Sequence, residues 1–246
     1  MIQWYPGHMH KASKEVRKIL PQVDLVIEVL DARLPGSSEN PMLAELRRDK
    51  PCIKLLNKSD LSDPGRLAPW IINLERQNLV KTLVCNTGDD SIFELPALCR
   101  SLVPKRNNRS SMIYAMIAGI PNVGKSTLIN KLAGRSVART GNEAALTRMQ
   151  QRIEISSDLT LIDTPGMLWG NIENEASGYR LAATGAIRDT ALELQEVASF
   201  IAEFLIEAYP ERLVQRYDIE PLPRTEIELL EAIARKRGCI VSGGRV

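Results

Sequence analysis

The sequence predicts an α/β fold with a mostly parallel sheet, followed by a small all-helical C-terminal domain. Two observations carry this prediction. Short apolar segments alternate with helical patterns up to about Gly170, which is typical of a parallel sheet covered by helices on both faces. Beyond that point the strand pattern ends and apolar residues recur at helical spacing. We therefore expect residues 1–170 to form an α/β domain and residues 171–246 a helical domain.

Short apolar runs mark six expected strands. They are Asp24–Leu30, Cys52–Leu56, Thr82–Cys85, Ile113–Ala118, Arg152–Ile155 and Leu159–Ile162. Between these runs, Asn40 can cap a helix that Pro41 begins, and Lys125–Ala133 should form a helix that ends at Gly134. The polar and basic stretch Pro104–Ser111 is expected to be a surface connection.

Two helices are expected in the C-terminal domain. Apolar residues from Leu192 to Ala208 lie along a helix that should stop at Pro210. A second helix should begin with the capping-box pattern Thr225-Glu-Ile-Glu228 and end at Gly238. An apolar stripe of this kind is more often core packing than a binding groove.

Composition is that of an ordinary soluble protein, with 44% hydrophobic and 25% charged residues. No apolar run approaches the roughly 20 residues that cross a bilayer, and the N-terminus lacks the features of a signal peptide. The scattered cysteines are interpreted as reduced, mostly buried thiols rather than as a zinc site or a disulfide framework. They are Cys52, Cys85, Cys99 and Cys239. We expect a cytoplasmic monomer that does not bind a membrane.

Net charge is +2, so bulk charge does not indicate a nucleic-acid partner. Local charge is more informative, because basic residues cluster between Lys11 and Lys18, between Lys105 and Arg109, and at Arg235–Arg237. Each cluster can be a solvated surface or a favourable helix C-terminus, or it can contact nucleic acid, and the sequence leaves these alternatives open.

A phosphate-binding loop is predicted by Gly119-Ile-Pro-Asn-Val-Gly124-Lys125-Ser126, which fits GxxxxGK[ST] and lies between a strand and a helix. Its glycines let backbone N–H groups turn toward the phosphates. Lys125 should reach the β- and γ-phosphates, and the Ser126 hydroxyl should bind Mg²⁺. The expected nucleotide contacts here are Asn122, Val123, Gly124, Lys125, Ser126 and Thr127.

Guanine selectivity is predicted by Asn57-Lys58-Ser59-Asp60, directly after a strand. Asp60 can accept two hydrogen bonds from guanine, a contact worth ~1–3 kcal/mol by analogy with base readout in nucleic acids. The aliphatic stem of Lys58 can lie over the base. Asn86-Thr87-Gly88 follows the next strand, and one of its backbone N–H groups can reach guanine O6.

The DxxG motif Asp163-Thr-Pro-Gly166 completes the predicted site for GTP and Mg²⁺. Asp163 should hold the metal through a water, and the Gly166 N–H should reach the γ-phosphate. Thr147 is the better candidate for a metal-binding switch threonine, with Thr140 as the alternative. Met167 follows DxxG where many GTPases have a water-orienting Gln, and its thioether cannot orient water, so that group must come from elsewhere.

The order of these motifs predicts a circularly permuted P-loop GTPase. Familiar small GTPases have the phosphate loop first, whereas here the guanine-reading motifs precede it. The same sheet can form if the usual ends are joined through Pro104–Ser111. The segment after Gly166 then leads directly into the helical domain, so nucleotide state can be passed to that domain mechanically.

With this motif order, the sequence resembles the circularly permuted ribosome biogenesis GTPase A family (YlqF/YawG type) from Gln3-Trp-Tyr-Pro-Gly-His-Met9 to Gly244. The resemblance implies hydrolysis of GTP to GDP in late assembly of the large ribosomal subunit. It also implies that the helical domain contacts rRNA of the subunit precursor. The alternatives are a GTP-gated RNA-binding scaffold and a GTPase with a non-ribosomal target, such as a tRNA-modifying complex.

The resemblance adds two expectations about the chemistry. His8 is implied as the catalytic group, although it can equally cap or pack locally. Asn122 is implied as a ligand of K⁺ beside the phosphates, where the ion would offset developing charge. The sequence departs from the family in having Ala144-Ala-Leu before Thr147 instead of Pro-Gly, and in ending at Val246 where family chains usually continue.

Overall fold

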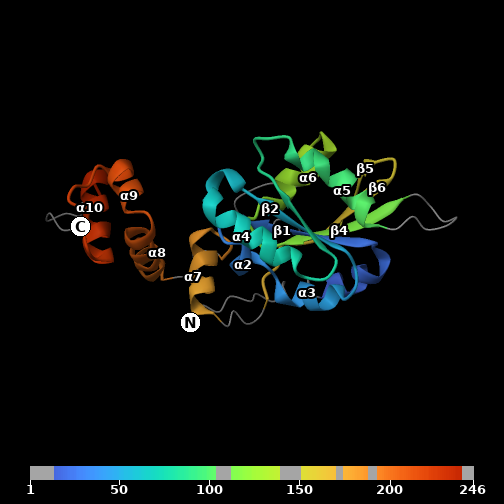
Figure 1. Cartoon of the computed structure of the whole chain (residues 1–246), viewed down its shortest axis with the longest axis horizontal. Coiled ribbons are helices and arrows are strands. Elements are labelled where there is room, and N and C mark those ends of the chain that lie inside the picture. Colours follow the sequence, from blue (N-terminus) through green and yellow to red (C-terminus); the bar gives the residue numbers. More distant parts are fainter. Residues whose placement is uncertain (1–13, 104–111, 139–150, 170–173, 188–192, 240–246) are drawn as a thin grey trace.

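The computed structural model describes residues 14–103, 112–138, 151–169, 174–187 and 193–239 (Figure 1). Six strands form one sheet in the order β3-β2-β1-β4-β6-β5. All neighbours pair in parallel except β5, which is antiparallel to β6. The strands are β1 (Leu25–Asp31), β2 (Cys52–Asn57), β3 (Val80–Val84), β4 (Ile113–Gly119), β5 (Gln151–Ser156) and β6 (Leu159–Asp163). The prediction of a mostly parallel α/β sheet from six apolar runs is confirmed.

Helices cover both faces of this sheet. The 3-10 and α-helices of this part are η1 (Leu20–Gln22), α2 (Pro35–Ser38), α3 (Pro41–Arg47), η2 (Ser59–Leu61), α4 (Pro64–Glu75), η3 (Ser91–Glu94), α5 (Leu95–Leu102) and α6 (Lys125–Ala133). The central strands β1, β2 and β4 are apolar along most of their length, because alternate residues face the two layers. On one face, Ile27 and Ile117 pack with α5 and α6. On the other, Val26 and Met116 pack with α3 and the helical residues 14–19.

Helix ends follow the predicted chemistry. The Asn40 side chain accepts the Met42 N–H at the start of α3, and Pro41 occupies the first turn. Gly134 ends α6 in the left-handed conformation.

The strand order reverses direction between the neighbouring central strands β1 and β4. From β1 the chain moves outward to β2 and β3, and from β4 it moves the opposite way to β6. The parallel strands end at one edge of the sheet with Asp31, Asn57, Gly119 and Asp163. Open α/β sheets bind ligands at such a switch point, outside the carboxyl ends of their strands.

Helices alone follow β6 in the described part of the chain: α7 (Glu175–Ala183), α8 (Leu194–Ala208), α9 (Pro210–Tyr217) and α10 (Glu226–Arg237). Figure 1 shows α7 between the sheet and the other three helices. Leu181 of α7 joins the core of the sheet domain, and the Ser37 hydroxyl donates to the Ser177 hydroxyl at 3.1 Å. Helix α7 therefore packs with the sheet, while α8, α9 and α10 share a separate small core.

The prediction of two C-terminal helices was incomplete, because the described part of residues 171–246 contains four, α7 to α10. The stripe that ends before Pro210 corresponds to α8, and the Thr225 hydroxyl accepts the Glu228 N–H at the start of α10, as the capping box predicts. Helix α9 between them was missed, because Pro210 both ends α8 and provides a favourable first residue for the next helix.

The prediction of mostly buried cysteines agrees with the structure. Cys52, Cys85 and Cys99 are buried and Cys239 is exposed, all as free thiols, and burial raises the pKa of each buried thiol to about 12. Among the described residues, no helix has the length and apolar character required to cross a membrane.

Candidate nucleotide-binding site

The loop that connects β4 to α6 has the backbone of a phosphate cradle. Asn122 and Gly124 both have positive φ, at 57° and 93°. A Cβ on Gly124 would lie 2.4 Å from the Asn57 Nδ2 atom, which leaves no room for a side chain. Glycine is thus required at this position both by backbone conformation and by the close approach of Asn57.

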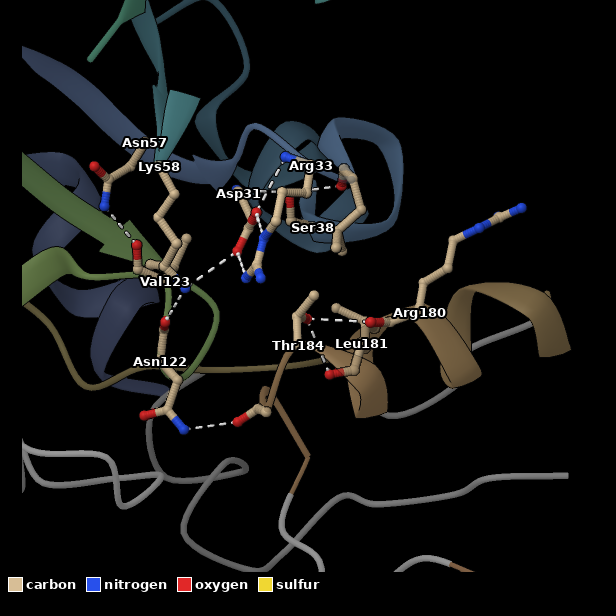
Figure 2. Close-up of polar contacts among 12 residues, drawn as sticks. Asp31, Arg33, Ser38, Asn57, Lys58, Asn122, Val123, Arg180, Leu181 and Thr184 are labelled. Carbon is tan, nitrogen blue, oxygen red and sulfur yellow. Dashed lines mark hydrogen bonds and ion pairs between the residues drawn. The ribbon is translucent and has the colours of Figure 1, made fainter. Parts of the chain in front are cut away.

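Two side chains of Asn57-Lys58-Ser59-Asp60 tie that motif to the phosphate loop (Figure 2). The buried Asn57 amide donates to the Val123 carbonyl at 2.7 Å. The Lys58 ammonium donates to the Asn122 carbonyl, also at 2.7 Å. The predicted base-reading and phosphate-binding segments are therefore held against each other, although 64 residues separate Lys58 from Asn122.

The base-reading side of this arrangement faces solvent. Asp60 is exposed, and the Ser59 N–H donates to the Cys85 carbonyl at 3.3 Å, which places the motif beside the loop that follows β3. In that loop the Asn86 Oδ1 atom accepts the Gly88 N–H at 2.6 Å, so its amide shapes the turn. Thr87 and Gly88 are exposed, and the structure brings these residues to the same edge as Asp60.

Lys125 and Asp163 form a buried ion pair at the centre of the site. Their side chains are 6% and 1% exposed, and the Lys125 ammonium donates to the Asp163 carboxylate. Burial raises the pKa of Asp163 above its ordinary value, although the charge and hydrogen bond of Lys125 oppose that rise. A bound phosphate would give Lys125 a second anionic partner beside this carboxylate.

The donor set fits Mg²⁺ held together with nucleotide phosphates. Asp163 supplies a carboxylate and Ser126 a half-buried hydroxyl at the first turn of α6. Within the described ranges, no group of three or more His, Cys, Asp or Glu residues is placed to hold a metal by itself. Mg²⁺ in nucleotide-binding enzymes is bound by one or two protein oxygens plus phosphate and water oxygens, so this set is sufficient.

The DxxG segment packs against the phosphate loop. The Met167 N–H donates to the Gly119 carbonyl at 3.1 Å, and a Cβ on Gly166 would lie 3.2 Å from the Pro121 Cα atom. The Met167 side chain is 1% exposed within the sheet core. Met167 is therefore a core residue, and its thioether also lacks a group that could orient a water.

Some predicted site residues cannot be placed by the structure. His8, Thr147 and Thr140 lie outside the described residues. One residue at the site was missed by the sequence analysis: Asp31, which contacts Lys58. The available signal was its position at the end of the strand β1, which neighbours the phosphate-loop strand β4.

Comparisons with known proteins give concordant results. A family model described as 50S ribosome-binding GTPase matches residues 114–224. Ribosome biogenesis GTPase A of Bacillus pumilus is 44% identical over 251 residues, covering 99% of this chain and 89% of that protein. Mitochondrial ribosome-associated GTPase 1 of Ictalurus punctatus is 34% identical over 254 residues, covering 97% and 79%. The crystal structure of GNP-bound YlqF from T. maritima matches with a TM-score of 0.64 and 28% identity, covering 96% of this chain and 87% of that chain.

Proposed function

This chain belongs to the ribosome biogenesis GTPase A family, and on that premise we propose a specific target for its GTP hydrolysis, the precursor of the large ribosomal subunit. It binds GTP and GDP, hydrolyses GTP and acts in ribosome biogenesis. The observation that carries the target is similarity over 99% of the chain to a protein named for ribosome biogenesis. We propose that it acts late in assembly, in the cytoplasm and as a monomer.

The proposed site uses the residues at the β1–β4 edge. Asp60 reads guanine, Lys58 covers the base, and the loop Asn86–Gly88 supports it. Residues 122–127 hold the phosphates, and the Gly166 N–H faces the γ-phosphate. Mg²⁺ is bound by Ser126, by Asp163 through water, and by Thr147. The exposed Asp60 and the buried Lys125–Asp163 pair support this division between base and phosphate ends.

Two parts of the proposed chemistry rest on the family resemblance. K⁺ is bound near Asn122, whose amide donates to the Gly185 carbonyl at 2.6 Å and so has a fixed orientation. His8 orients the attacking water, a role supported by the burial of Met167.

Helix α7 is the proposed link between nucleotide state and the helical domain. Its C-terminal end is bonded to the phosphate loop through Asn122 and Gly185. At its other side Tyr179 stacks on Phe200 of α8, with ring centroids 5.0 Å apart. A second contact reaches the guanine-reading side, where the Tyr209 hydroxyl donates to Asp63, three residues beyond Asp60, at 2.9 Å. Movement of the phosphate loop would thus shift α8 relative to the sheet.

The helical domain is proposed to contact rRNA through its basic residues. Arg235, Lys236 and Arg237 occupy the last turn of α10. Arg235 and Lys236 pair with Glu231 and Asp218, and the Arg237 guanidinium lies 5.7 Å from the centre of the Tyr217 ring. Phosphate contacts from such residues would make binding strongly dependent on salt.

Co-sedimentation with ribosomal particles tests the target. We expect the protein to sediment with large-subunit precursors in a non-hydrolysable GTP analogue and to be released in GDP. Precursors should also stimulate GTP turnover, which separates a hydrolysing assembly factor from a GTP-gated scaffold. Nucleotide-dependent binding without stimulation of turnover would argue for the GTP-gated scaffold. Partners retained after RNase treatment would argue for a non-ribosomal target, and equal recovery in both nucleotides would contradict GTP-dependent binding.

Base choice is tested by Asp60→Asn. An amide presents a donor where the carboxylate accepted the guanine amine, so GTP affinity should fall on the order of 10- to 100-fold, equivalent to ~1–3 kcal/mol. Affinity for xanthosine triphosphate, whose base has an acceptor there, should rise. Competition against a fluorescent GDP measures both, and the unchanged protein must also bind GTP far better than ATP if Asp60 reads guanine.

A further inference from the structure

Asp31 occupies the last position of β1, beside the phosphate-loop strand β4. Its carboxylate is almost fully buried, with 2% of the side chain exposed. Lys58, which reaches it from the end of β2, donates to Oδ2 at 3.2 Å. The same ammonium donates to the Asn122 carbonyl at 2.7 Å, so Lys58 lies between a buried anion and the phosphate loop (Figure 2).

The loop after β1 holds the Asp31 carboxylate in one orientation before a nucleotide binds. The Asp31 N–H donates to the Ser38 hydroxyl at 3.0 Å, which folds the short helix α2 back onto the strand end. Arg33 forms a two-pronged pair with Asp31, with Nε at 2.8 Å from Oδ1 and Nη2 at 2.6 Å from Oδ2. Bidentate pairing of this kind sets the orientation of the carboxylate as well as its charge.

The charge on Asp31 is maintained despite burial. Burial alone would raise the pKa of this carboxyl, but the hydrogen bonds and charges of Arg33, together with the charge of Lys58, hold the pKa below its usual value. Lys58 thus faces a permanent, rigid anion. The Lys58 side chain is 23% exposed, and a lysine stem is flexible by itself. The contacts of its ammonium with Asp31 and with the Asn122 carbonyl restrict that flexibility.

We propose that Asp31 is a positioning residue that holds Lys58 across the guanine and phosphate loops, and thereby sets the affinity for guanine nucleotides without touching them. The inference rests on the proposed role of Lys58 at the base. A lysine held by Asp31 presents its methylene stem to the base in one conformation. Without Asp31, the Lys58 side chain would have to be ordered when the nucleotide binds. The loss of conformational entropy in that step lowers the affinity for the nucleotide.

A double-mutant cycle on GDP affinity tests the proposal. Asp31→Asn removes the charge but keeps the shape, and it should raise the Kd for fluorescent GDP about tenfold, as expected for one hydrogen bond to a charged group. The rate of GTP hydrolysis at saturating nucleotide should change by less than about twofold, because Asp31 contacts Arg33 and Lys58, neither of which is assigned to the γ-phosphate. In a Lys58→Met background, Asp31→Asn should have no further effect on Kd.

Arg33→Met provides the matched control, since it removes a partner of the same carboxylate but leaves the Asp31–Lys58 contact. Because Arg33 also orients the carboxylate and lowers its pKa, this variant should weaken GDP binding, but by less than Asp31→Asn does. Because Asp31→Asn leaves a half-buried guanidinium without its anion, the variant Asp31→Asn/Arg33→Met is measured as well. That pair avoids the unpaired charge and should show the same tenfold loss.

The outcomes separate this inference from the site assignment. If Lys58→Met weakens GDP binding but Asp31→Asn does not, or if the two losses simply add, Asp31 does not act through Lys58 and the inference is wrong. If Lys58→Met leaves GDP affinity unchanged, the assignment of Lys58 to the base is wrong and the inference fails with it.

Discussion

Replacing Lys125 by Ala is expected to abolish GTP turnover and to destabilise the fold. The variant loses the positive charge at the β- and γ-phosphates, and loss of one such group lowers turnover on the order of 100- to 1,000-fold. It also leaves the Asp163 carboxylate, 1% exposed, without its cationic partner. An unpaired buried charge costs ~3–5 kcal/mol, a large fraction of the ~5–15 kcal/mol that stabilises a typical domain. Phosphate release and urea denaturation without nucleotide measure the two effects.

The matched variant Lys125→Ala/Asp163→Asn distinguishes these effects. Because it removes both charges of the pair, it should recover most of the lost unfolding free energy. Turnover should stay as low as in Lys125→Ala, since the phosphate and metal contacts are both absent. If stability is not regained in the double variant, the ion pair is not the cause of the loss, and Lys125 contributes chiefly through packing.

The sheet could be predicted from sequence because its signal is local. The run Cys52–Leu56 is apolar except at Lys54, and a short run of this kind is typical of a strand buried on both faces. The antiparallel direction of β5 was not predictable in this way, because strand direction depends on chain connections outside the strand. Helix α9 was missed because a proline can either follow the end of one helix or begin the next, and Pro210 does both.

The candidate site was predictable only in part. Motifs such as Gly119–Ser126 specify their own backbone, so those predicted residues that the structure describes lie at the carboxyl ends of the parallel strands. Asp31 was missed because its importance depends on Lys58, which is 27 residues away and follows another strand, β2. The requirement for Gly124 has a similar origin, since the clashing atom belongs to Asn57. Contacts between strand ends arise from sheet order, which the motifs themselves do not encode.

A second buried ion cluster, formed by Lys54, Glu28 and Glu39, leads to the other prediction with a large expected effect, a loss of stability. Lys54 of β2 is fully buried and donates to Glu28 of β1 at 2.5 Å and to Glu39 at 2.8 Å. Burial lowers the pKa of Lys54, but the two carboxylates more than offset this and hold it above its ordinary value. Lys54→Met should therefore destabilise the protein by ~3–5 kcal/mol at pH 7, because Glu28 becomes an unpaired buried charge. Urea denaturation measures this loss.

The size of that loss should depend on pH in a definite direction. Burial raises the pKa of Glu28 above its ordinary value even beside Lys54, and removing Lys54 takes away the strongest opposing influence. The folded variant then holds a proton that the unfolded chain releases, so its stability relative to the unchanged protein falls as pH rises above the ordinary range of a glutamate. The deficit should be smaller at pH 5 than at pH 7. In Lys54→Met/Glu28→Gln, where the amide still accepts the Asn40 N–H, the deficit should be smaller at pH 7 and nearly independent of pH. A deficit in Lys54→Met that is constant across this range would mean that the loss comes from packing around Lys54 and not from the charge on Glu28.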